Sequence, residues 1–293
     1  MARMIRVDAE LVRRKMARSR AEASELIRAG RVFLDGGEVT KPARLMDPAQ
    51  ALVVREAGLE HYVSRGAYKL LGALDALGAA GPQIAGVHAL DAGASTGGFT
   101  DVLLRRGAAH VTAVDVGYGQ LAWKLREDPR VTVMERVNVR SLQAGQITPA
   151  PQLVVGDLSF ISLTLVIPAL VAVAASDAEF LLMVKPQFEV GRQKIGAHGV
   201  VRNPEYHVEA TLKVAQSART NGLGIQAVAA SPLPGPAGNV EYFLYMRAGT
   251  PDQLGENLEN AVRTAVANGP AGKTATIGQT STGAQETRGV ARE

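Results

Sequence analysis

The sequence predicts an α/β chain in two parts, a doubly wound, mostly parallel sheet preceded by a small α+β module. Three observations lead to this prediction. Strand-like and helix-like patterns alternate from Arg65 onward, a glycine-rich turn follows the first strand of that series, and residues 1–58 contain only short patterns. Such alternation is typical of parallel strands whose connecting helices cover both faces of a sheet.

The first part of the chain, residues 1–58, reads as a compact module of two short helices, a hairpin signal and one further strand. Asp8 and Ser19 stand where helix N-caps are expected, and Glu22 follows Ser19 at the spacing of a capping box. Residues 1–31 carry nine basic and four acidic side chains, a net charge of +5, whereas the whole chain carries +4. The basic end is therefore a candidate contact for a polyanion.

A larger domain, residues 65–268, is expected to follow a linker at residues 59–64. Its helices are expected at 66–79, 97–106, 119–127, 161–175, 204–221 and 254–268, and its strands at 86–93, 110–117, 130–135, 152–159, 179–185, 225–231 and 240–247. The last two strands have no helix between them, which predicts an antiparallel hairpin at the edge of the sheet. Residues 269–293 are rich in Gly, Thr, Ala and Gln and are expected to form a disordered tail.

The composition disfavours several classes of protein. There is no cysteine, which excludes disulfides and thiolate metal sites and fits a reducing cytoplasm. The five histidines are scattered, so we expect no metal. The N-terminus has no apolar signal segment, and the longest apolar run, residues 163–175, is too short to span a bilayer. We therefore expect a cytoplasmic protein with no membrane partner, and we take it to be a monomer.

The stretch LDAGASTGGFTDVLL reads as strand, glycine-rich turn and helix, a pattern that brings backbone amides close to a ligand. A dinucleotide fingerprint would need glycine where Ser95 stands, and no G-x-x-x-x-G-K-S/T loop is present. Asp91 precedes the turn, and Asp115 ends the next strand, where an acid binds ribose hydroxyls. The pattern favours a positively charged nucleoside, S-adenosylmethionine, over an NAD-type ligand or a turn without a ligand.

The stretch FLLMVKPQFEVG places Lys185 at the end of an apolar run that is typical of a buried central strand. A charge in such a position is costly unless it has a partner. Taken alone, the position leaves two interpretations open. Lys185 either forms an ordinary ion pair with a nearby carboxylate, which is the simpler interpretation, or serves as a catalytic amine.

Phrases along most of the chain resemble one known family. They are SRAEASELIRAGRVFLDG, VSRGAYKL, LDAGASTGGFT, DVGYGQLAW, DLSFISL, MVKPQFEVG and SPLPGPAGNVEYFL. Residues 65–248 resemble the FtsJ-like ribose 2′-O-methyltransferases, residues 6–56 resemble the S-four-type RNA-binding module, and this order of modules resembles the TlyA family. The resemblance implies a Rossmann-like methyltransferase sheet, and methylation by S-adenosylmethionine of the cytidine 2′-hydroxyl in 16S ribosomal RNA, 23S ribosomal RNA or both. It also implies a link to sensitivity to capreomycin-type antibiotics.

The family's Lys-Asp-Lys-Glu tetrad falls on Lys69, Asp157, Lys185 and Glu241. A ribose 2′-hydroxyl is a poor nucleophile, so the enzyme must align the attack and remove one proton. A lysine can remove it only if its pKa falls well below the free value of about 10.4, and burial and a second nearby cation lower that value. We hypothesise that Lys185 is the general base, that Lys69 and Glu241 orient it and the ribose, and that Asp157 positions the methyl group and Lys185.

The remaining candidate residues fall into two groups. Those expected to contact the cofactor are Asp91, Gly93, Ser95, Thr96, Gly97, Asp115 and Asn138. Those expected to contact RNA phosphates from the small module are Arg6, Arg18, Ser19, Arg20 and Arg28. Any single arginine of this group could equally be an ordinary solvated surface charge.

Two further classes of function remain open. A ribosome-assembly factor with an inert methyltransferase fold would bind ribosomal RNA without catalysis, and the intact tetrad argues against it. A pore-forming haemolysin is a label that some relatives carry, and the lack of a spanning segment argues against that function.

Overall fold

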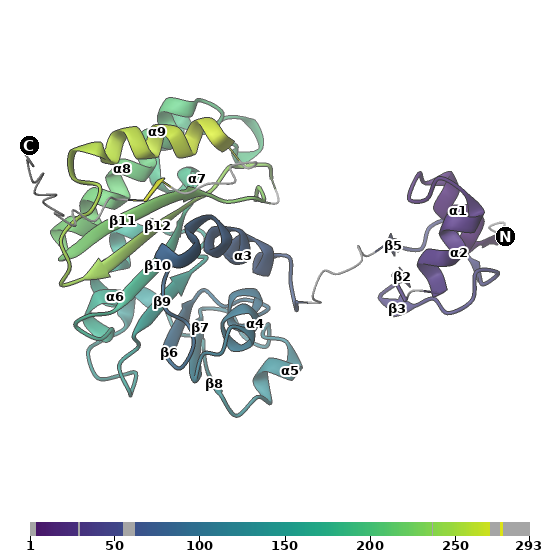
Figure 1. Cartoon of the computed structure of the whole chain (residues 1–293), viewed down its shortest axis with the longest axis horizontal. Helices are drawn as coiled ribbons and strands as arrows, with labels where there is room; N and C mark the ends of the chain where they lie inside the picture. Colours follow the sequence, from purple (N-terminus) through teal and green to yellow (C-terminus); the bar gives the residue numbers. More distant parts are fainter. Residues whose placement is uncertain (1–3, 29, 55–61, 236, 270–275, 278–293) are drawn as a thin grey trace, which may run out of the picture. The chain divides into compact units, whose positions relative to one another are not determined.

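The computed structural model describes residues 4–28, 30–54, 62–235, 237–269 and 276–277 of the 293-residue chain. The chain divides into two compact units, Met1–His61 and Tyr62–Glu293, and each is described by itself (Figure 1). Of the linker predicted at residues 59–64, positions 59–61 lie outside the described residues.

The described residues of the small unit form two helices and five short strands. They are β1 (Ile5–Arg6), α1 (Val7–Arg13), α2 (Arg20–Arg28), β2 (Val32–Leu34), β3 (Gly37–Glu38), β4 (Leu45–Met46) and β5 (Leu52–Val54). Strand β2 pairs antiparallel with both β3 and β5, and β1 pairs antiparallel with β4. Apolar side chains such as Leu11, Ile27 and Val32 fill its separate core. This unit is therefore the α+β module that the sequence predicts.

The predicted N-caps of this unit have different outcomes. The Ser19 hydroxyl accepts a hydrogen bond from the Glu22 amide at 3.2 Å at the start of α2, which confirms Ser19 as a cap. Asp8 was expected to cap α1, and this is wrong, because the N-cap position belongs to Arg6. Asp8 lies inside the first turn, where Arg6 and Arg20 bind its carboxylate.

The larger unit is built on one eight-stranded sheet in the order β13-β11-β12-β10-β9-β6-β7-β8 (Figure 1). Its strands are β6 (His88–Ala92), β7 (His110–Asp115), β8 (Val131–Glu135), β9 (Leu153–Gly156), β10 (Glu179–Val184), β11 (Leu223–Ala230), β12 (Tyr242–Ala248) and β13 (Thr276–Ile277). Strands β8, β7, β6, β9 and β10 pair in parallel, and β12 runs antiparallel to β10 and β11. The central strands therefore end at one edge of the sheet, while β12 begins there.

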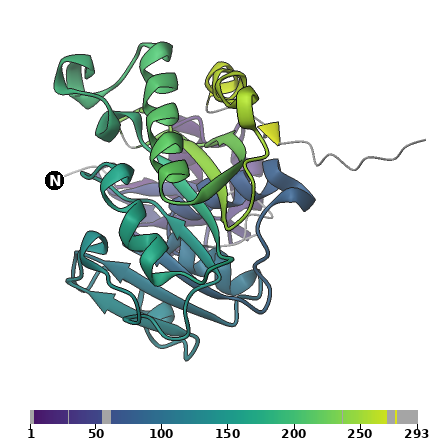
Figure 2. The same ribbon diagram turned by 90° about the vertical axis from the view of Figure 1, so that its left-hand side faces the viewer.

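Helices cover both faces of this sheet (Figures 1 and 2). They are α3 (Gly66–Leu77), α4 (Gly98–Arg105), α5 (Trp123–Arg126), α6 (Ile167–Val173), α7 (Pro186–Glu189), α8 (Pro204–Thr220) and α9 (Leu258–Asn268). Side chains of α3, α4 and α5 share one apolar cluster, and those of α6, α8 and α9 share another. Such two-sided cover confirms the doubly wound α/β fold.

After its first residue, Glu179, strand β10 is apolar without alternation. All six of its residues are buried. Leu181 and Met183 face the α3–α4 layer, whereas Phe180 and Leu182 face the α6–α8 layer. A strand covered by helices on both faces has no solvent side, so no polar residue interrupts the run.

Four elements differ from the sequence-based expectation. Strand β12 lies inside the sheet, between β10 and β11, so the predicted hairpin is present but is not wholly at the edge. The helix expected at 119–127 is only Trp123–Arg126. The helix expected at 161–175 begins with a 3-10 turn, η3 (Leu163–Leu165), and continues as α6 with Pro168 in its first turn. Within the tail predicted to be disordered, Thr276–Ile277 form β13 because β11 offers an open edge for pairing.

Helix α3 lies unusually close to the segment that leads into β12. A Cβ atom placed on Gly72 would lie 2.3 Å from Pro232 Cγ and 2.8 Å from Pro232 Cδ. Distances this short do not occur between real side chains, so glycine is what permits the approach.

We therefore predict that Gly72→Ala lowers the free energy of unfolding. Overpacking costs about 1–3 kcal/mol and the better helix propensity of alanine returns about 1 kcal/mol, which leaves about 0–2 kcal/mol. Because the approach to Pro232 Cγ would be only 2.3 Å, we expect a net loss near the upper end of that range in urea unfolding. Gly66→Ala is the matched control, because its Cβ would meet only Ser64 Oγ, at 3.4 Å. Equal stability of the two variants would contradict the close approach.

Candidate active site

Strand ends from distant parts of the chain meet at one edge of the sheet. In the register of β10 and β12, Val184 pairs with Tyr242. Lys185 follows Val184, and Glu241 precedes Tyr242, so the antiparallel direction of β12 brings these two charged residues to the same edge. Asp157 follows Gly156, the last residue of β9, and β9 pairs with β10. The topology alone thus explains why three of the four predicted catalytic residues are neighbours.

The fourth residue, Lys69, comes from α3 and completes an alternating cluster of charges. Lys69 Nζ donates a hydrogen bond to Glu241 Oε2 at 2.6 Å and lies 3.8 Å from Asp157 Oδ2. Lys185 Nζ lies 2.5 Å from Asp157 Oδ1 and donates a hydrogen bond to Ser159 Oγ at 2.7 Å. The contact with Asp157 Oδ1 is an ion pair without hydrogen-bond alignment, because only the contact with Ser159 is aligned.

The cluster is largely removed from water. The exposed fraction of the side chain is 6% for Lys69, 9% for Lys185, 2% for Glu241 and 21% for Asp157. Burial raises the pKa of Glu241 above its ordinary value, and the charge of Lys69 opposes that rise. Buried charges are tolerated only when they are paired, and two lysines here meet two carboxylates. Asp157 is the most exposed member and links the two lysines.

The glycine-rich turn lies beside the cluster. Gly93 has φ of 85°, and a Cβ atom on it would lie 3.0 Å from Leu158 Cδ2 and 3.2 Å from the Asp157 carbonyl oxygen. The Ser95 amide donates to Asp115 Oδ2 at 2.8 Å, and the Gly117 amide donates to Asp115 Oδ1 at 2.7 Å. Asp115 therefore ties the turn after β6 to the end of β7.

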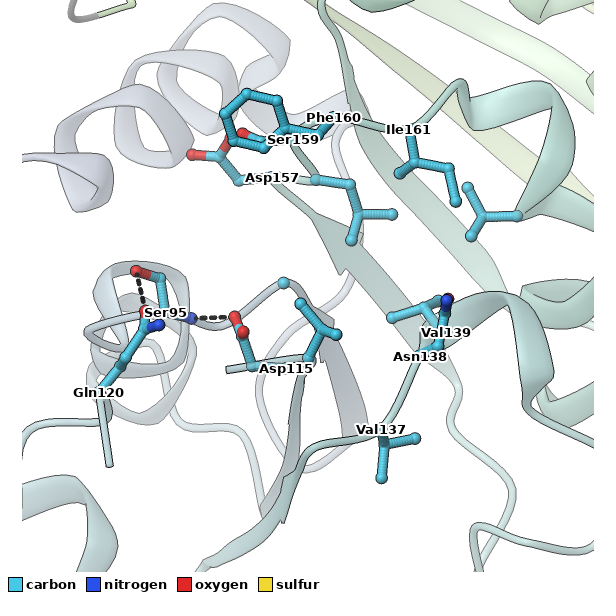
Figure 3. A pocket seen from close by; sticks show the side chains of 14 residues that line it. Ser95, Asp115, Gln120, Val137, Asn138, Val139, Asp157, Ser159, Phe160 and Ile161 are labelled. Carbon is cyan, nitrogen blue, oxygen red and sulfur yellow. Dashed lines mark hydrogen bonds between the residues drawn. The ribbon is translucent and has the colours of Figure 1, made fainter. Parts of the chain in front are cut away.

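A cavity of about 500 Å³ opens between the turn and the ends of the strands (Figure 3). It is lined by Gly93, Ser95, Asp115, Val116, Gln120, Val137, Asn138, Val139, Asp157, Leu158, Ser159, Phe160, Ile161 and Val166. Figure 3 shows the polar group Ser95, Asp115 and Gln120 on one side, and Val137, Val139 and Ile161 on the other. The cavity thus has a polar end and an apolar end.

A second cavity, of about 300 Å³, has three members of the charged cluster, Lys69, Asp157 and Lys185, in its lining. It is lined by Ser64, Arg65, Gly66, Lys69, Asp91, Gly93, Ala94, Ser95, Thr96, Gly98, Phe99, Asp157, Ser159 and Lys185. Four residues, Gly93, Ser95, Asp157 and Ser159, line both cavities. The two cavities therefore adjoin beside Lys185.

Asp91 is a buried carboxylate in the second cavity. Its Oδ2 accepts hydrogen bonds from the Thr100 amide at 2.9 Å and the Thr100 hydroxyl at 2.7 Å. Its Oδ1 accepts none from the described residues. Desolvation raises the pKa of Asp91 to about 7, although the two bonds from Thr100 oppose the rise. An oxygen left without a partner in a cavity is positioned to receive a donor from a ligand.

The other residues predicted to contact a cofactor lie around the same turn. Thr96 lines the second cavity and Asn138 the first, where its side chain also accepts a hydrogen bond from the Arg140 amide at 3.0 Å. Gly97 is not among the described residues that line either cavity. Its φ of 96° places it as the left-handed cap of α4, and a Cβ there would lie 2.3 Å from Leu125 Cδ1. Gly97 therefore closes the turn rather than facing the cavity.

Sequence analysis missed part of this site. Ser159 contacts Lys185, and Gln120 bonds to Ser95 Oγ at 3.3 Å, yet neither was singled out. Phe160, also missed, is 91% exposed and lines the larger cavity. The only signal for these residues was their place in the phrases DLSFISL and DVGYGQLAW, since polar residues in loops have no periodicity.

The candidate RNA contacts lie in the small unit, mostly near α2. Arg6 and Arg20 both bind Asp8, at 2.8 Å and 2.9 Å, and the Arg6 hydrogen bond is the main reason that the pKa of Asp8 falls to about 2. Arg18 pairs with Glu22, although its side chain is 93% exposed. Ser19 is occupied as the helix cap, and Arg28 is exposed in the last turn of α2. Paired arginines at the surface still present outward N–H groups.

Comparison with known families assigns both units. The sequence model of the FtsJ-like methyltransferases matches residues 62–248, and that of the S4 domain matches residues 5–49. No helix among the described residues is long and apolar enough to cross a membrane.

Individual relatives are similar over most of the chain. A Mycobacterium tuberculosis protein named 16S/23S rRNA (cytidine-2′-O)-methyltransferase TlyA is 55% identical over 271 residues, which is 92% of this chain and 100% of the relative. A Campylobacter jejuni protein named 23S rRNA (cytidine-2′-O)-methyltransferase TlyA is 32% identical, covering 80% of this chain and 96% of the relative. A solved structure from Streptococcus thermophilus, named as a hemolysin, has a TM-score of 0.69 and 34% identity, covering 92% of this chain and 96% of that one.

Proposed function

Because this chain belongs to the TlyA family of FtsJ-like methyltransferases, we propose that it transfers a methyl group from S-adenosylmethionine to the 2′-hydroxyl of cytidine in ribosomal RNA. The observation that carries the proposal is the convergence of Lys69, Asp157, Lys185 and Glu241 where two cavities adjoin. Methyl transfer needs such a point, because the methyl donor and the acceptor hydroxyl must be held together there in the geometry of the attack.

The residues that line the two adjoining cavities fit S-adenosylmethionine, with the methionine part beside Asp91 in the smaller cavity and the nucleoside part in the larger one. The unpartnered Oδ1 of Asp91 suits the ammonium group of the methionine part, and Asp115 suits the ribose hydroxyls. The apolar side chains of Val137, Val139 and Ile161 suit the adenine, with Asn138 beside them. When bound, S-adenosylmethionine supplies an electrophilic methyl group on a sulfonium whose leaving thioether is neutral.

Within this proposal Lys185 is the general base. As a neutral amine it accepts the proton of the 2′-hydroxyl and becomes an ammonium ion. The carboxylate of Asp157, 2.5 Å from Nζ, stabilises that ammonium as it forms. Lys69 lies against both Asp157 and Glu241 and keeps the two carboxylates in place. Because the leaving group is a neutral thioether, no general acid is required.

The small unit is proposed to bind the RNA. Its match to the S4 domain and the net charge of +5 over residues 1–31 support this role. Arg6, Arg18, Arg20 and Arg28 are the proposed phosphate contacts, with Ser19 beside them. We further propose that both 16S and 23S ribosomal RNA are substrates, in keeping with the activity for which the 55% identical Mycobacterium tuberculosis relative is named.

The affinity for S-adenosylmethionine is predicted to depend on pH through Asp91. In the protein without a ligand, the carboxyl group of Asp91 has a pKa of about 7. A bound cation favours the ionised form of this carboxyl group. Binding below that pH must displace a proton, so the affinity should fall by up to about tenfold per unit as pH drops from 7 to 5.5. Isothermal titration calorimetry checks this, with Asp91→Asn as the variant whose weaker binding does not change over that range. A constant affinity in the unaltered protein would contradict the contact.

The role of Lys185 is tested on unmodified ribosomal subunits with methyl-labelled S-adenosylmethionine. The unaltered protein should label the 2′-oxygen of cytidine, located by nuclease digestion of each ribosomal RNA. Lys185→Ala should lower kcat by about 10³-fold or more, because proton removal is lost.

Lys185→Arg separates loss of the base from loss of the positive charge, since a guanidinium keeps the charge but cannot act as a base near neutral pH. Both variants should bind S-adenosylmethionine within about threefold of the unaltered affinity, equivalent to less than about 0.7 kcal/mol. A folded Lys185→Arg protein that keeps more than about one tenth of kcat would sink the assignment, because it would retain most of the catalytic effect.

A further inference from the structure

Ser159 holds a position that the tetrad does not account for. It lies two residues after Asp157, and its Oγ accepts a hydrogen bond from Lys185 Nζ at 2.7 Å. It is also one of the four residues that line both cavities. Figure 3 shows Ser159 beside Asp157 at the rim of the larger cavity. Of those four residues, only Asp157 and Ser159 have side-chain contacts with Lys185.

The hydrogen bond between Lys185 and Ser159 restricts the direction of the lone pair on Lys185 Nζ. A neutral lysine nitrogen has four tetrahedral directions, occupied by Cε, two hydrogens and one lone pair. Ser159 Oγ accepts one hydrogen in an aligned bond, and Asp157 Oδ1, 2.5 Å from Nζ but not aligned for a hydrogen bond, attracts the second hydrogen by its charge. The lone pair is then confined to the one remaining direction. With Asp157 alone, rotation about the Cε–Nζ bond would exchange the lone pair with the second hydrogen.

We propose that Ser159 is a positioning residue for the transfer reaction, which aims the lone pair of Lys185 at the hydroxyl of the acceptor ribose. This role rests on the proposed function of Lys185 as general base. It assigns to Ser159 a task that the charged residues do not perform, because the ion pair with Asp157 has no hydrogen-bond alignment and the bond to Ser159 Oγ fixes the direction of one N–H group.

Hydrogen bonds and a ring contact join the segment after Ser159 to helix α7, which follows Lys185. Helix α7 begins directly after Lys185 and ends at Glu189, whose buried carboxylate accepts hydrogen bonds from Ser162 Oγ at 2.5 Å and the Leu163 amide at 2.7 Å. A second contact joins the two segments, since the rings of Phe160 and Phe188 lie 5.2 Å apart between centroids. The contact between Ser159 and Lys185 is thus held by the scaffold, as positioning requires.

The main test compares Ser159→Ala and Ser159→Thr with the unaltered protein in single-turnover methylation of ribosomal subunits. Loss of one hydrogen bond that orients the base should lower the rate of the chemical step by about tenfold. The Michaelis constants for S-adenosylmethionine and RNA should stay within about twofold, because Ser159 acts through Lys185 rather than through binding. Ser159→Thr keeps the hydroxyl at an exposed position and should recover the rate to within about threefold.

The pH profile supplies a readout that a merely structural role would not move. The hydroxyl oxygen stabilises the ammonium form of Lys185 more than the amine form, since hydrogen bonds to charged groups are stronger. In Ser159→Ala the ascending limb of the rate profile should therefore move to lower pH. Thr264→Ala is the matched control, because it removes an exposed hydroxyl on α9 whose one partner among the described residues is the Asn260 carbonyl. Its rate and profile should equal those of the unaltered protein.

Two results would overturn the proposal for Ser159. One is a Ser159→Ala protein with the unaltered rate and pH profile, and the other is a loss confined to the Michaelis constants, which would make Ser159 a binding residue. Absence of methyl transfer by the unaltered protein would have a different meaning, because it would overturn the proposed function and this role with it.

Discussion

The structure of the larger unit depends on one constraint, the mutual neutralisation of Lys69, Glu241, Asp157 and Lys185 in a place with little water. Each charge there would be costly alone, and breaking one pair of a buried cluster typically costs about 3–5 kcal/mol. Lys69 lies on α3, whereas Asp157 and Lys185 follow β9 and β10 and Glu241 precedes β12, so their pairing requires these elements to meet at one point. The topology brings the four residues together, and their pairing stabilises the arrangement.

The reversed direction of β12 is the feature of the topology that makes the cluster possible. In a fully parallel sheet, the residue before a strand would lie at the opposite edge from the residue after its neighbour. Because β12 is antiparallel to β10, Glu241 instead lies beside Lys185 and within reach of Lys69. The same edge carries the glycine-rich turn, so the cavity that suits a nucleoside opens next to the charges. Ligand cavities at the ends of parallel strands follow the general rule for such sheets.

Much of this arrangement could be predicted from the sequence, and the limits have physical reasons. The alternation of patterns predicted the sheet and its helices, and the apolar run before Lys185 predicted a buried strand correctly. Glu241 is different, because an alternating pattern assigns its face only when the neighbouring strands are known. The short helix near Trp123 and the pairing of β13 depend on contacts that local propensity does not contain. Ser159 has no local signal at all, since a serine in a loop acquires its role only from the lysine that it meets.

The central claim is that the amine of Lys185 removes the proton, and the absence of cysteine from the chain permits a direct measurement. Lys185→Cys creates a single thiol, which 2-bromoethylamine converts to a lysine analogue with sulfur in its side chain and a less basic amine. The methylation rate is then followed against pH before and after alkylation. The account predicts an inactive cysteine variant whose activity returns on alkylation, with the ascending limb of the profile at lower pH than in the unaltered protein. Activity without alkylation, or a recovered profile identical to that of the unaltered protein, would contradict it.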